Sequence, residues 1–282
     1  MRSERGGSPI PPRTSVPFES EIDGMSRQND LARIGEALAA AAEAVRPFTP
    51  GAVDYDVKSS RGDPVTAADL AANEVLMELL PSAGEGWLSE ETADSPERLR
   101  HQRVWIVDPL DGTREFVDGI PEWCISIGLV EDGIPVAGGI LSPPTGQLIL
   151  GAVGVGVTLN GEAIEPTGRK TLDGAVILAS RSEWKRGEWD RYETASFEVK
   201  PCGSVAFKLG QVAAGLADGT WTLVPKHEWD VAGGAALMLA AGGTLFHADW
   251  TRPRFNQPSP KLPNFLAATE ELLVEFKEKW LD

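Results

Sequence analysis

The sequence predicts a mixed α and β protein in two halves, and three patterns along the chain lead to this prediction. Two helix-like segments, with apolar residues at three- and four-residue steps, come first; long apolar strands joined by hairpin turns follow, and strands then alternate with helices. A strand meander beside two helices is typical of a sheet covered on one face, and alternation is typical of an α/β half. We therefore divide the chain into a tail over 1–27, a first half over 28–170 and a second half over 171–282.

The first half begins with the two helices. An alanine-rich helix is expected over 29–45, ending before Pro47, and a second helix is expected to open at Thr66 and to close before Pro81. Hairpin dipeptides such as Asn160 followed by Gly161 separate the strands that come next. These strands are predicted over 104–108, 124–130, 134–141 and 148–159.

The second half alternates between the two kinds of element. Strands are predicted over 175–179, near Val199, and over 221–224, 244–246 and 265–268. Helices are predicted over 204–216, 231–241 and 270–280.

Composition excludes several classes of protein. The 42 acidic residues exceed the 26 basic ones and give a net charge of −16, which argues against a nucleic-acid polymer as partner. Cys124 and Cys202 lie far apart, so neither a disulfide framework nor a cysteine-based zinc site is expected, and a reducing cytoplasm fits best. Residues 1–24 do not have the pattern of a secretory signal, and no stretch approaches 18 uncharged apolar residues, so we expect no membrane segment.

The most informative stretch is DPLDGT, at residues 108–113. It follows a short apolar strand that should stop at Asp108, because Pro109 cannot donate to a sheet ladder. Gly112 allows close approach to a ligand, and Thr113 can open a helix at Arg114, whose free amides favour an anion. Acids beside an anion site imply a bound cation, and two carboxylates about 4 Å apart repel by roughly 4 kcal/mol at an effective dielectric near 20. Ordinary turn formation is the alternative for an isolated pair of acids.

Three other groups of acids have an ordinary structural alternative. Asp69 stands three residues after Thr66, the spacing of a helix-capping box. Glu90 and Glu91 are adjacent acids of the kind that usually lie on a solvated surface. Asp230 precedes the helix expected over 231–241, where a carboxylate caps free amides.

Taken as a whole, DPLDGT resembles the signature of the lithium-sensitive, magnesium-dependent phosphatase superfamily, which includes the inositol monophosphatases, fructose bisphosphatases and 3'(2'),5'-bisphosphate nucleotidases. VTAAD, ending at Asp69, and WDVAGG, containing Asp230, resemble two further elements of that superfamily. The resemblance covers about residues 31–281. It implies a five-layer α-β-α-β-α sandwich of the inositol monophosphatase and fructose-1,6-bisphosphatase type.

The resemblance also implies the site residues. Metal ligands would come from Glu90, Asp108, the Leu110 carbonyl, Asp111 and Asp230, an all-oxygen set that suits two or three Mg²⁺ ions and disfavours zinc or copper. Asp69 and Thr113 would activate the attacking water, with Glu91 as a further water-activating candidate. Lys58 matches the superfamily's loop lysine, and a solvated loop lysine is its alternative. The reaction implied is phosphomonoester hydrolysis, with a small phosphorylated substrate and, as in many relatives, a possible homodimer.

Local features point to the CysQ-like bisphosphate nucleotidase branch, which would act in sulfur assimilation on the 3'-phosphate of 3'-phosphoadenosine 5'-phosphate or its sulfate ester. Arg114-Glu115-Phe116 and Ser180-Arg181-Ser182 resemble elements of that branch. Substrate contacts are expected from Gly112, Thr113, Ser180, Gly203, Ser204, Lys208 and Asp230. Glu183 departs from the branch, which generally has a histidine there. Inositol monophosphate or a sugar phosphate is the alternative substrate.

A hypothesis of another class is a catalytically silent metal- or partner-binding protein, because phosphatase folds can be reused without activity. A silent relative would be expected to have lost Asp69, Thr113 or one of the four acids. All of them are present in this chain.

Overall fold

The computed structural model describes residues 24–57 and 64–281. The predicted tail therefore lies outside the described residues except for 24–27, and those four residues already belong to the first helix, α1 (Gly24–Val45). Lys58 also lies outside the described residues. Within the described part of the chain, no helix is both long and apolar enough to cross a membrane.

The described strands form two large sheets and two small two-stranded ones. The seven-stranded sheet has the order β3-β4-β5-β6-β7-β8-β9, and β3 and β4 are its parallel pair. Its strands are β3 (Glu85–Ser89), β4 (Arg103–Asp111), β5 (Cys124–Glu131), β6 (Ile134–Ser142), β7 (Gln147–Ala152), β8 (Gly156–Leu159) and β9 (Glu162–Ile164).

The five-stranded sheet comes from the second half of the chain and has the order β11-β10-β12-β16-β14. Its strands are β10 (Val176–Ser180), β11 (Glu198–Cys202), β12 (Gly219–Thr222), β14 (Thr244–Phe246) and β16 (Phe265–Ala268). The two small sheets pair β1 (Tyr55–Val57) with β2 (Pro64–Thr66), and β13 (Lys226–His227) with β15 (Lys261–Leu262).

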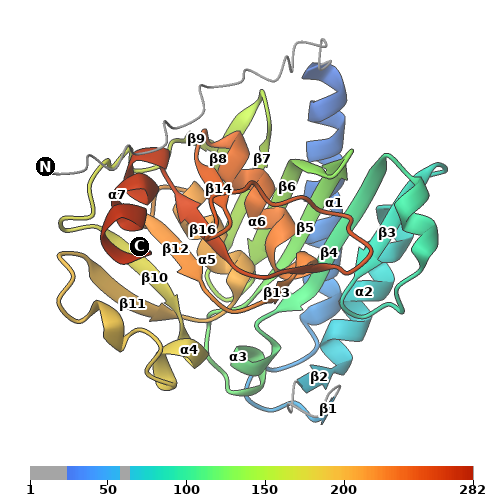
Figure 1. Ribbon diagram of the computed structural model, residues 1–282. Helices are drawn as coiled ribbons and strands as arrows, with labels where there is room; N and C mark the ends of the chain where they lie inside the picture. The colour runs from blue at the N-terminus through green and yellow to red at the C-terminus, as the bar shows by residue number, and fades with distance from the viewer. Residues whose placement is uncertain (1–23, 58–63, 282) are drawn as a thin grey trace, which may run out of the picture.

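Helices separate and cover the sheets (Figure 1). The pair α1 and α2 (Ala67–Leu79) covers one face of the seven-stranded sheet. The pair α5 (Val205–Ala213) and α6 (Glu228–Ala240) fills the space between the two sheets, and α7 (Glu270–Trp280) covers the outer face of the five-stranded sheet. The five-layer α-β-α-β-α arrangement expected from the resemblance is confirmed.

Glycine lets the central helix α6 approach the seven-stranded sheet closely. A Cβ at Gly138 would lie 2.5 Å from the Gly233 carbonyl oxygen, and one at Gly128 would lie 2.7 Å from the Ala232 carbonyl carbon. Side chains at these positions would push α6 away from the sheet, and α6 carries Asp230 in its first turn.

The structure corrects several expected element boundaries. The helix expected over 204–216 ends at Ala213 as α5, and the strand expected over 221–224 is β12 over Gly219–Thr222. Strand β4 does not stop at Asp108 but continues to Asp111, because a bulge places Pro109 and Leu110 opposite one residue of β5, so the proline nitrogen has no ladder partner to lose. The strand expected over 148–159 is a hairpin of β7 and β8 that turns at Gly154, where φ is +85°. Helix α6 begins at Glu228, so Asp230 lies inside its first turn. Helix α3 (Thr113–Val117) begins one residue before the expected Arg114.

Candidate active site

Carboxylates from three separate segments meet at one end of the seven-stranded sheet. Glu90 directly follows β3, Asp108 lies in β4, and Asp230 is the third residue of α6. One oxygen of each carboxylate lies within 4.8 Å of the other two. The parallel pairing of β3 with β4 sets Ser89 beside Val107, which explains why residues far apart in sequence arrive together.

The electrostatics of this group favour a bound cation. Burial raises the pKa of Asp230 well above its usual range, and the negative charges of Asp111 and Glu90 raise it further. A divalent cation would remove this penalty, because its charge favours the ionised form of every carboxylate around it. Since the donors are all oxygen atoms, the group fits a hard cation such as Mg²⁺.

Asp111 lies near these three carboxylates, but hydrogen bonds from α5 hold its side chain in place. Its Oδ2 accepts a hydrogen bond of 2.6 Å from the Ser204 hydroxyl and another from the backbone nitrogen of Ala206. These bonds tie the end of β4 to the first turn of α5. Burial raises the pKa of Asp111, while the hydrogen bonds oppose that effect. Asp111 thus lies beside the three-carboxylate group and not within it.

Asp69 both caps helix α2 and contacts Thr113. Its Oδ2 accepts a bond of 2.9 Å from the Thr66 backbone nitrogen and one of 2.6 Å from the Thr66 hydroxyl, completing the capping box of α2. Its Oδ1 accepts a bond of 2.9 Å from the Thr113 hydroxyl, which lies 3.1 Å from the Leu110 carbonyl oxygen. The structure therefore brings together the two residues expected to activate water.

Gly112 makes the turn between β4 and α3 possible. Its φ of +97° is in the left-handed region, and a Cβ there would lie 3.0 Å from the Glu122 carbonyl oxygen and 3.1 Å from the Trp123 Cβ. Any other residue would be strained by the backbone conformation and crowded by its neighbours. The turn keeps the backbone at 112–113 exposed to the cavity above it.

Two adjoining cavities contain most of the predicted site residues. The first, of about 500 Å³, is lined by Glu90, Asp111, Gly112, Thr113 and Asp230 among others. The second, of about 560 Å³, is lined by five of the predicted substrate-binding residues: Gly112, Ser180, Gly203, Ser204 and Lys208. Both cavities share Asp111, Gly112, Arg114, Glu115, Val205, Pro225 and Lys226. Glu91 does not line either cavity, and its water-activating role stays a prediction.

Lys208 lines the second cavity, but its ammonium group is bonded to the protein backbone. Its side chain is buried, and its ammonium group donates to the backbone carbonyls of Ser204 and Cys202, the latter at 3.4 Å. Burial lowers its pKa. The lysine therefore stabilises the turn before α5, and it has few donors left for a second phosphate.

Sequence reasoning missed the ion pair between Glu183 and Lys226. Glu183 is buried in α4 (Arg181–Lys185), and its Oε1 accepts a bond of 2.7 Å from Thr222 and one of 3.0 Å from the Lys226 ammonium. The acid that replaces the expected histidine therefore holds a lysine that lines both cavities. The sequence offered one signal for a cation at the site, because Lys226 lies four residues before Asp230.

Arg181 is also paired inside the protein. It makes a two-pronged ion pair with Glu122, whose Oε2 accepts a further bond of 2.7 Å from the Gly203 backbone nitrogen. Glu115 packs against the same glycine, because a Cβ at Gly203 would lie 2.5 Å from the Glu115 Cγ. This set fixes the wall of the second cavity.

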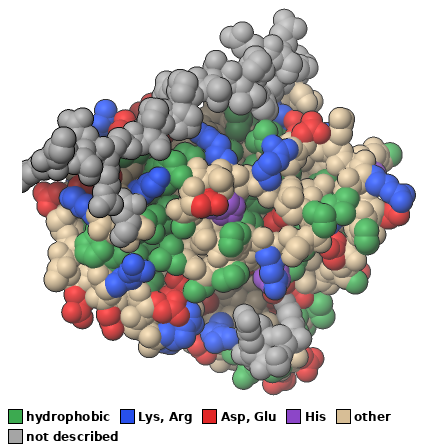
Figure 2. All heavy atoms as spheres, viewed as in Figure 1, with side chains coloured by type: hydrophobic (Ala, Val, Ile, Leu, Met, Phe, Trp, Pro, Cys, Tyr) green, Lys and Arg blue, Asp and Glu red, His purple; other side chains and the backbone are tan. Residues whose placement is uncertain are grey.

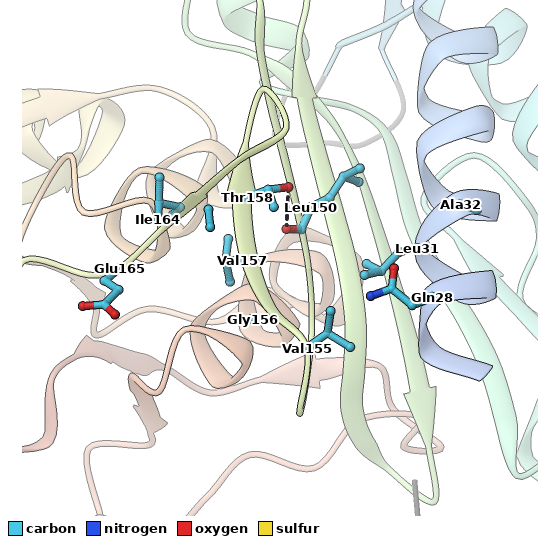
Figure 3. Close-up of a pocket in the computed structure, with 11 residues that line it drawn as sticks. Gln28, Leu31, Ala32, Leu150, Val155, Gly156, Val157, Thr158, Ile164 and Glu165 are labelled. Atoms are coloured by element: carbon cyan, nitrogen blue, oxygen red, sulfur yellow. Dashed lines mark hydrogen bonds between the residues drawn. The ribbon is translucent and has the colours of Figure 1, made fainter. Parts of the chain in front are cut away.

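Among the residues that the structure describes, no basic one lines the cavity between α1 and the strands β7 to β9, which therefore does not fit a phosphate. This cavity measures about 630 Å³ and is lined mainly by apolar residues such as Leu31 and Leu150, with Glu165 as its acid (Figure 3). On the face drawn in Figure 2, Lys and Arg side chains are interspersed with acidic and hydrophobic ones and do not gather in one patch.

The layered fold, the hard-cation carboxylate group and the adjacent Asp69–Thr113 pair together define a metal-dependent phosphatase. The chain belongs to the inositol monophosphatase family, whose family model matches residues 26–279. Members of this family typically use Mg²⁺, and the Glu90, Asp108 and Asp230 cluster is consistent with that.

Known proteins of the family resemble the chain over most of its length. Inositol monophosphatase 1 of Solanum lycopersicum is 32% identical over 79% of this chain and 87% of its own. The structure of inositol monophosphatase from Anabaena (Nostoc) sp. PCC 7120 superposes with a TM-score of 0.73 at 27% identity, covering 90% of this chain and 94% of that one. CysQ from Bacteroides thetaiotaomicron gives the same TM-score and identity, covering 87% and 99%.

Proposed function

We propose that the protein is a Mg²⁺-dependent phosphomonoesterase whose substrate is a small polyol monophosphate such as inositol 1-phosphate. The observation that carries this proposal is the group of converging acids beside the Asp69–Thr113 hydrogen bond. The similarity to named inositol monophosphatases supports the choice of substrate.

The metal-binding residues proposed are Glu90, Asp108, Asp111, Asp230 and the carbonyl of Leu110, which would hold two or three ions. When bound, Mg²⁺ supplies positive charge that neutralises phosphoryl oxygens and lowers the pKa of a water. The two buried acids, Asp108 and Asp111, are fixed by the bulge at the end of β4, so the ligand geometry is built into the sheet.

The residues of the chain itself position the attacking water. The Thr113 hydroxyl donates to Asp69 or to the Leu110 carbonyl, which leaves its oxygen free to accept a hydrogen from water. We propose that this water attacks phosphorus in line with the ester oxygen and passes its proton through the Thr113 hydroxyl toward Asp69. As the phosphorus–oxygen ester bond breaks, the departing oxygen takes up a proton from solvent water and leaves as the alcohol. Backbone amides at Gly112 and Thr113 would hold phosphoryl oxygens, and the Lys226 ammonium would face the substrate from the shared wall of the cavities.

Charge in the second cavity favours a substrate with one phosphate. Among the described residues, five cations line this cavity: Arg114, Arg181, Arg186, Lys208 and Lys226. Three of them already have carboxylate partners, namely Glu122 for Arg181, Glu188 for Arg186 and Glu183 for Lys226. Lys208 donates to backbone carbonyls. Little positive charge is therefore left to hold a second phosphate.

The second candidate is the 3'-phosphate of a nucleoside 3',5'-bisphosphate, with the role in sulfur assimilation that this branch implies. This candidate requires that one or more of the five cations exchange an internal partner for a phosphate. The similarity to CysQ and the Arg114-Glu115-Phe116 and Ser180-Arg181-Ser182 elements support it.

The test compares phosphate release from inositol 1-phosphate and from 3'-phosphoadenosine 5'-phosphate, each with Mg²⁺ and with a chelator. We expect faster release from inositol 1-phosphate, abolished by the chelator. A preference for the nucleotide would favour the second candidate. Absence of turnover for both and for a panel of sugar phosphates would revive the catalytically silent protein considered from the sequence.

A further inference from the structure

A fourth cavity lies on the far part of α6, away from the acids of the candidate active site. It measures about 580 Å³ and is bounded by four parts of the chain besides α6: the start of β6, the residue after β7, β14 and the segment 252–255. Its lining residues are Ile134, Pro135, Val136, Val153, Ala235, Leu239, Leu245, Arg252, Pro253, Arg254 and Phe255. Leu239 is nine residues beyond Asp230 on the same helix, about 13 Å along its axis. The cavity is thus separate from the proposed active site.

The lining of this cavity is apolar except for two arginines. Among the described residues, no acid lines it, whereas Glu90, Asp111, Glu115 and Asp230 line the first cavity and Asp111 and Glu115 the second. An acid-free cavity with two guanidinium groups is unusual in a chain whose net charge is −16. A mostly apolar cavity of a few hundred Å³ with a few fixed polar groups is the common form of a small-molecule site.

Both arginine side chains are exposed to solvent, and contacts with the protein orient each of them. Arg254 donates to the Asp132 carbonyl and lies against Gly133, where a Cβ would be 3.0 Å from its Nη2. Arg252 lies over the ring of Phe246, 5.2 Å from the ring centroid.

The segment that carries these arginines is itself fastened. Its Phe255 backbone nitrogen donates to the Gly133 carbonyl at 3.0 Å. Among the described residues, no carboxylate forms an ion pair with Arg252 or Arg254, so both charges remain available to a ligand.

We propose that this cavity binds a small amphipathic anion, an apolar chain or ring that carries one carboxylate. The apolar body would lie against Val136, Ala235 and Leu239, and the carboxylate would meet the guanidinium groups of Arg252 and Arg254. Charge complementarity selects this occupant over a neutral lipid, and the apolar floor selects it over a free inorganic anion.

The test is isothermal titration calorimetry of the full chain with octanoate in the presence of a chelator. Octanol supplies the same apolar chain without the charge, and acetate supplies the charge without the chain. We expect saturable binding of octanoate, with weaker binding of octanol and of acetate. Because no metal and no phosphate ester is present, the result does not depend on the proposed phosphatase activity.

Variants then locate the binding. The double variant Arg252→Gln with Arg254→Gln should weaken octanoate binding by about tenfold or more, the scale of a lost charge-assisted hydrogen bond. Arg46→Gln, at an exposed arginine that does not line the cavity, is the control and should bind as the native chain does. Circular dichroism checks that each variant is folded. Absence of saturable binding below the concentration at which octanoate forms micelles would overturn the proposal, as would equal binding by the double variant.

Discussion

The two cavities of the candidate active site differ in how their charged residues are arranged; the first is the acidic side and the second is the basic side. On the acidic side, Glu90, Asp108 and Asp230 crowd together, and burial and the charges of Asp111 and Glu90 raise the pKa of Asp230. On the basic side, most charges are paired within the protein, as Arg181 is with Glu122 and Lys226 with Glu183. Charged groups of one sign that lie close together therefore indicate a ligand site better than the number of charged residues does. The predictions below start with the largest expected effect.

Removal of one acid should abolish activity while leaving the fold intact. Asp108→Asn should lower Mg²⁺-dependent phosphate release by at least about a hundredfold, the upper end of what loss of an outer-shell partner costs at a metal site. Steady-state assays with inositol 1-phosphate measure the effect. Asp173→Asn, at an exposed acid outside the site, is the control. Native activity in Asp108→Asn would show that the acidic side is not catalytic.

Loss of the Thr113 hydroxyl should slow catalysis without unfolding α2. Thr113→Val removes the donor to Asp69 while the bonds from Thr66 that complete the capping box remain. We expect kcat to fall about a hundredfold, within the range for a misplaced general base, with KM little changed. Thr66→Val is the contrasting variant, and it should mainly cost stability, about 1 kcal/mol for a lost cap. Equal kcat losses in the two variants would argue for a structural role alone.

On the basic side, removal of Glu183 should cost stability because it leaves Lys226 unpaired. Glu183→Gln should lower the free energy of unfolding by about 2 kcal/mol, as expected for a lost bond between charged groups. Adding Lys226→Met should restore part of this loss, because the unpaired charge disappears, and a double-mutant cycle by urea denaturation measures the coupling. Glu188→Gln, in an exposed pair, should cost less than about 1 kcal/mol. Additive losses in the cycle would show that Glu183 and Lys226 act separately.

Glu85 is an acid whose hydrogen bonds within the protein contribute to its stability. Burial alone would raise its pKa, but hydrogen bonds from Trp105, Arg33 and Arg103 outweigh burial and lower the pKa to about 2 from 4.5. Its stabilising contribution is therefore present above pH 4.5 and is lost as the pH falls toward 2.

Glu85→Gln should accordingly cost about 2 kcal/mol at pH 7, a figure reduced for solvent screening, and the difference from the native chain should shrink by pH 3.5. Urea denaturation at both pH values measures it, with the exposed Glu78→Gln as control. A difference that does not change with pH would contradict the ion-pair explanation.

The smallest effect is expected for Lys208. Since its ammonium group donates to backbone carbonyls, Lys208→Met should lower the melting temperature and should change phosphate release from the two candidate substrates by the same factor. A loss confined to 3'-phosphoadenosine 5'-phosphate would instead assign Lys208 to a second phosphate. That result would favour the nucleotide candidate.

The acidic side could be predicted from sequence because its residues sit in short contiguous stretches. Asp108 and Asp111 share one six-residue string, and Asp69 is three residues from the threonine that it caps. The end of β4 was less predictable, because a bulge opposite β5 accommodates Pro109. Local propensity carries no information about such a partner strand.

The basic side could not be predicted because its contacts are distant in sequence. Glu183 and Lys226 are 43 residues apart, and Arg181 and Glu122 are 59 apart. Such contacts decide whether a lysine is free to bind a ligand or is bonded within the protein, and only the folded structure shows them. Lys208 is the clearest case, since its helix position suggested a phosphate contact and its ammonium group lies buried on two carbonyls.

Mg²⁺ binding to the native chain, measured by calorimetry without substrate, tests most directly whether the acidic side holds the metal. We predict saturable binding accompanied by a higher melting temperature, because the ion relieves repulsion among Glu90, Asp108 and Asp230. In Asp230→Asn the binding should be lost, and the metal-free protein should melt at a higher temperature than the metal-free native chain. Mg²⁺ binding of equal affinity in Asp230→Asn would contradict the assignment of this cluster as the metal site.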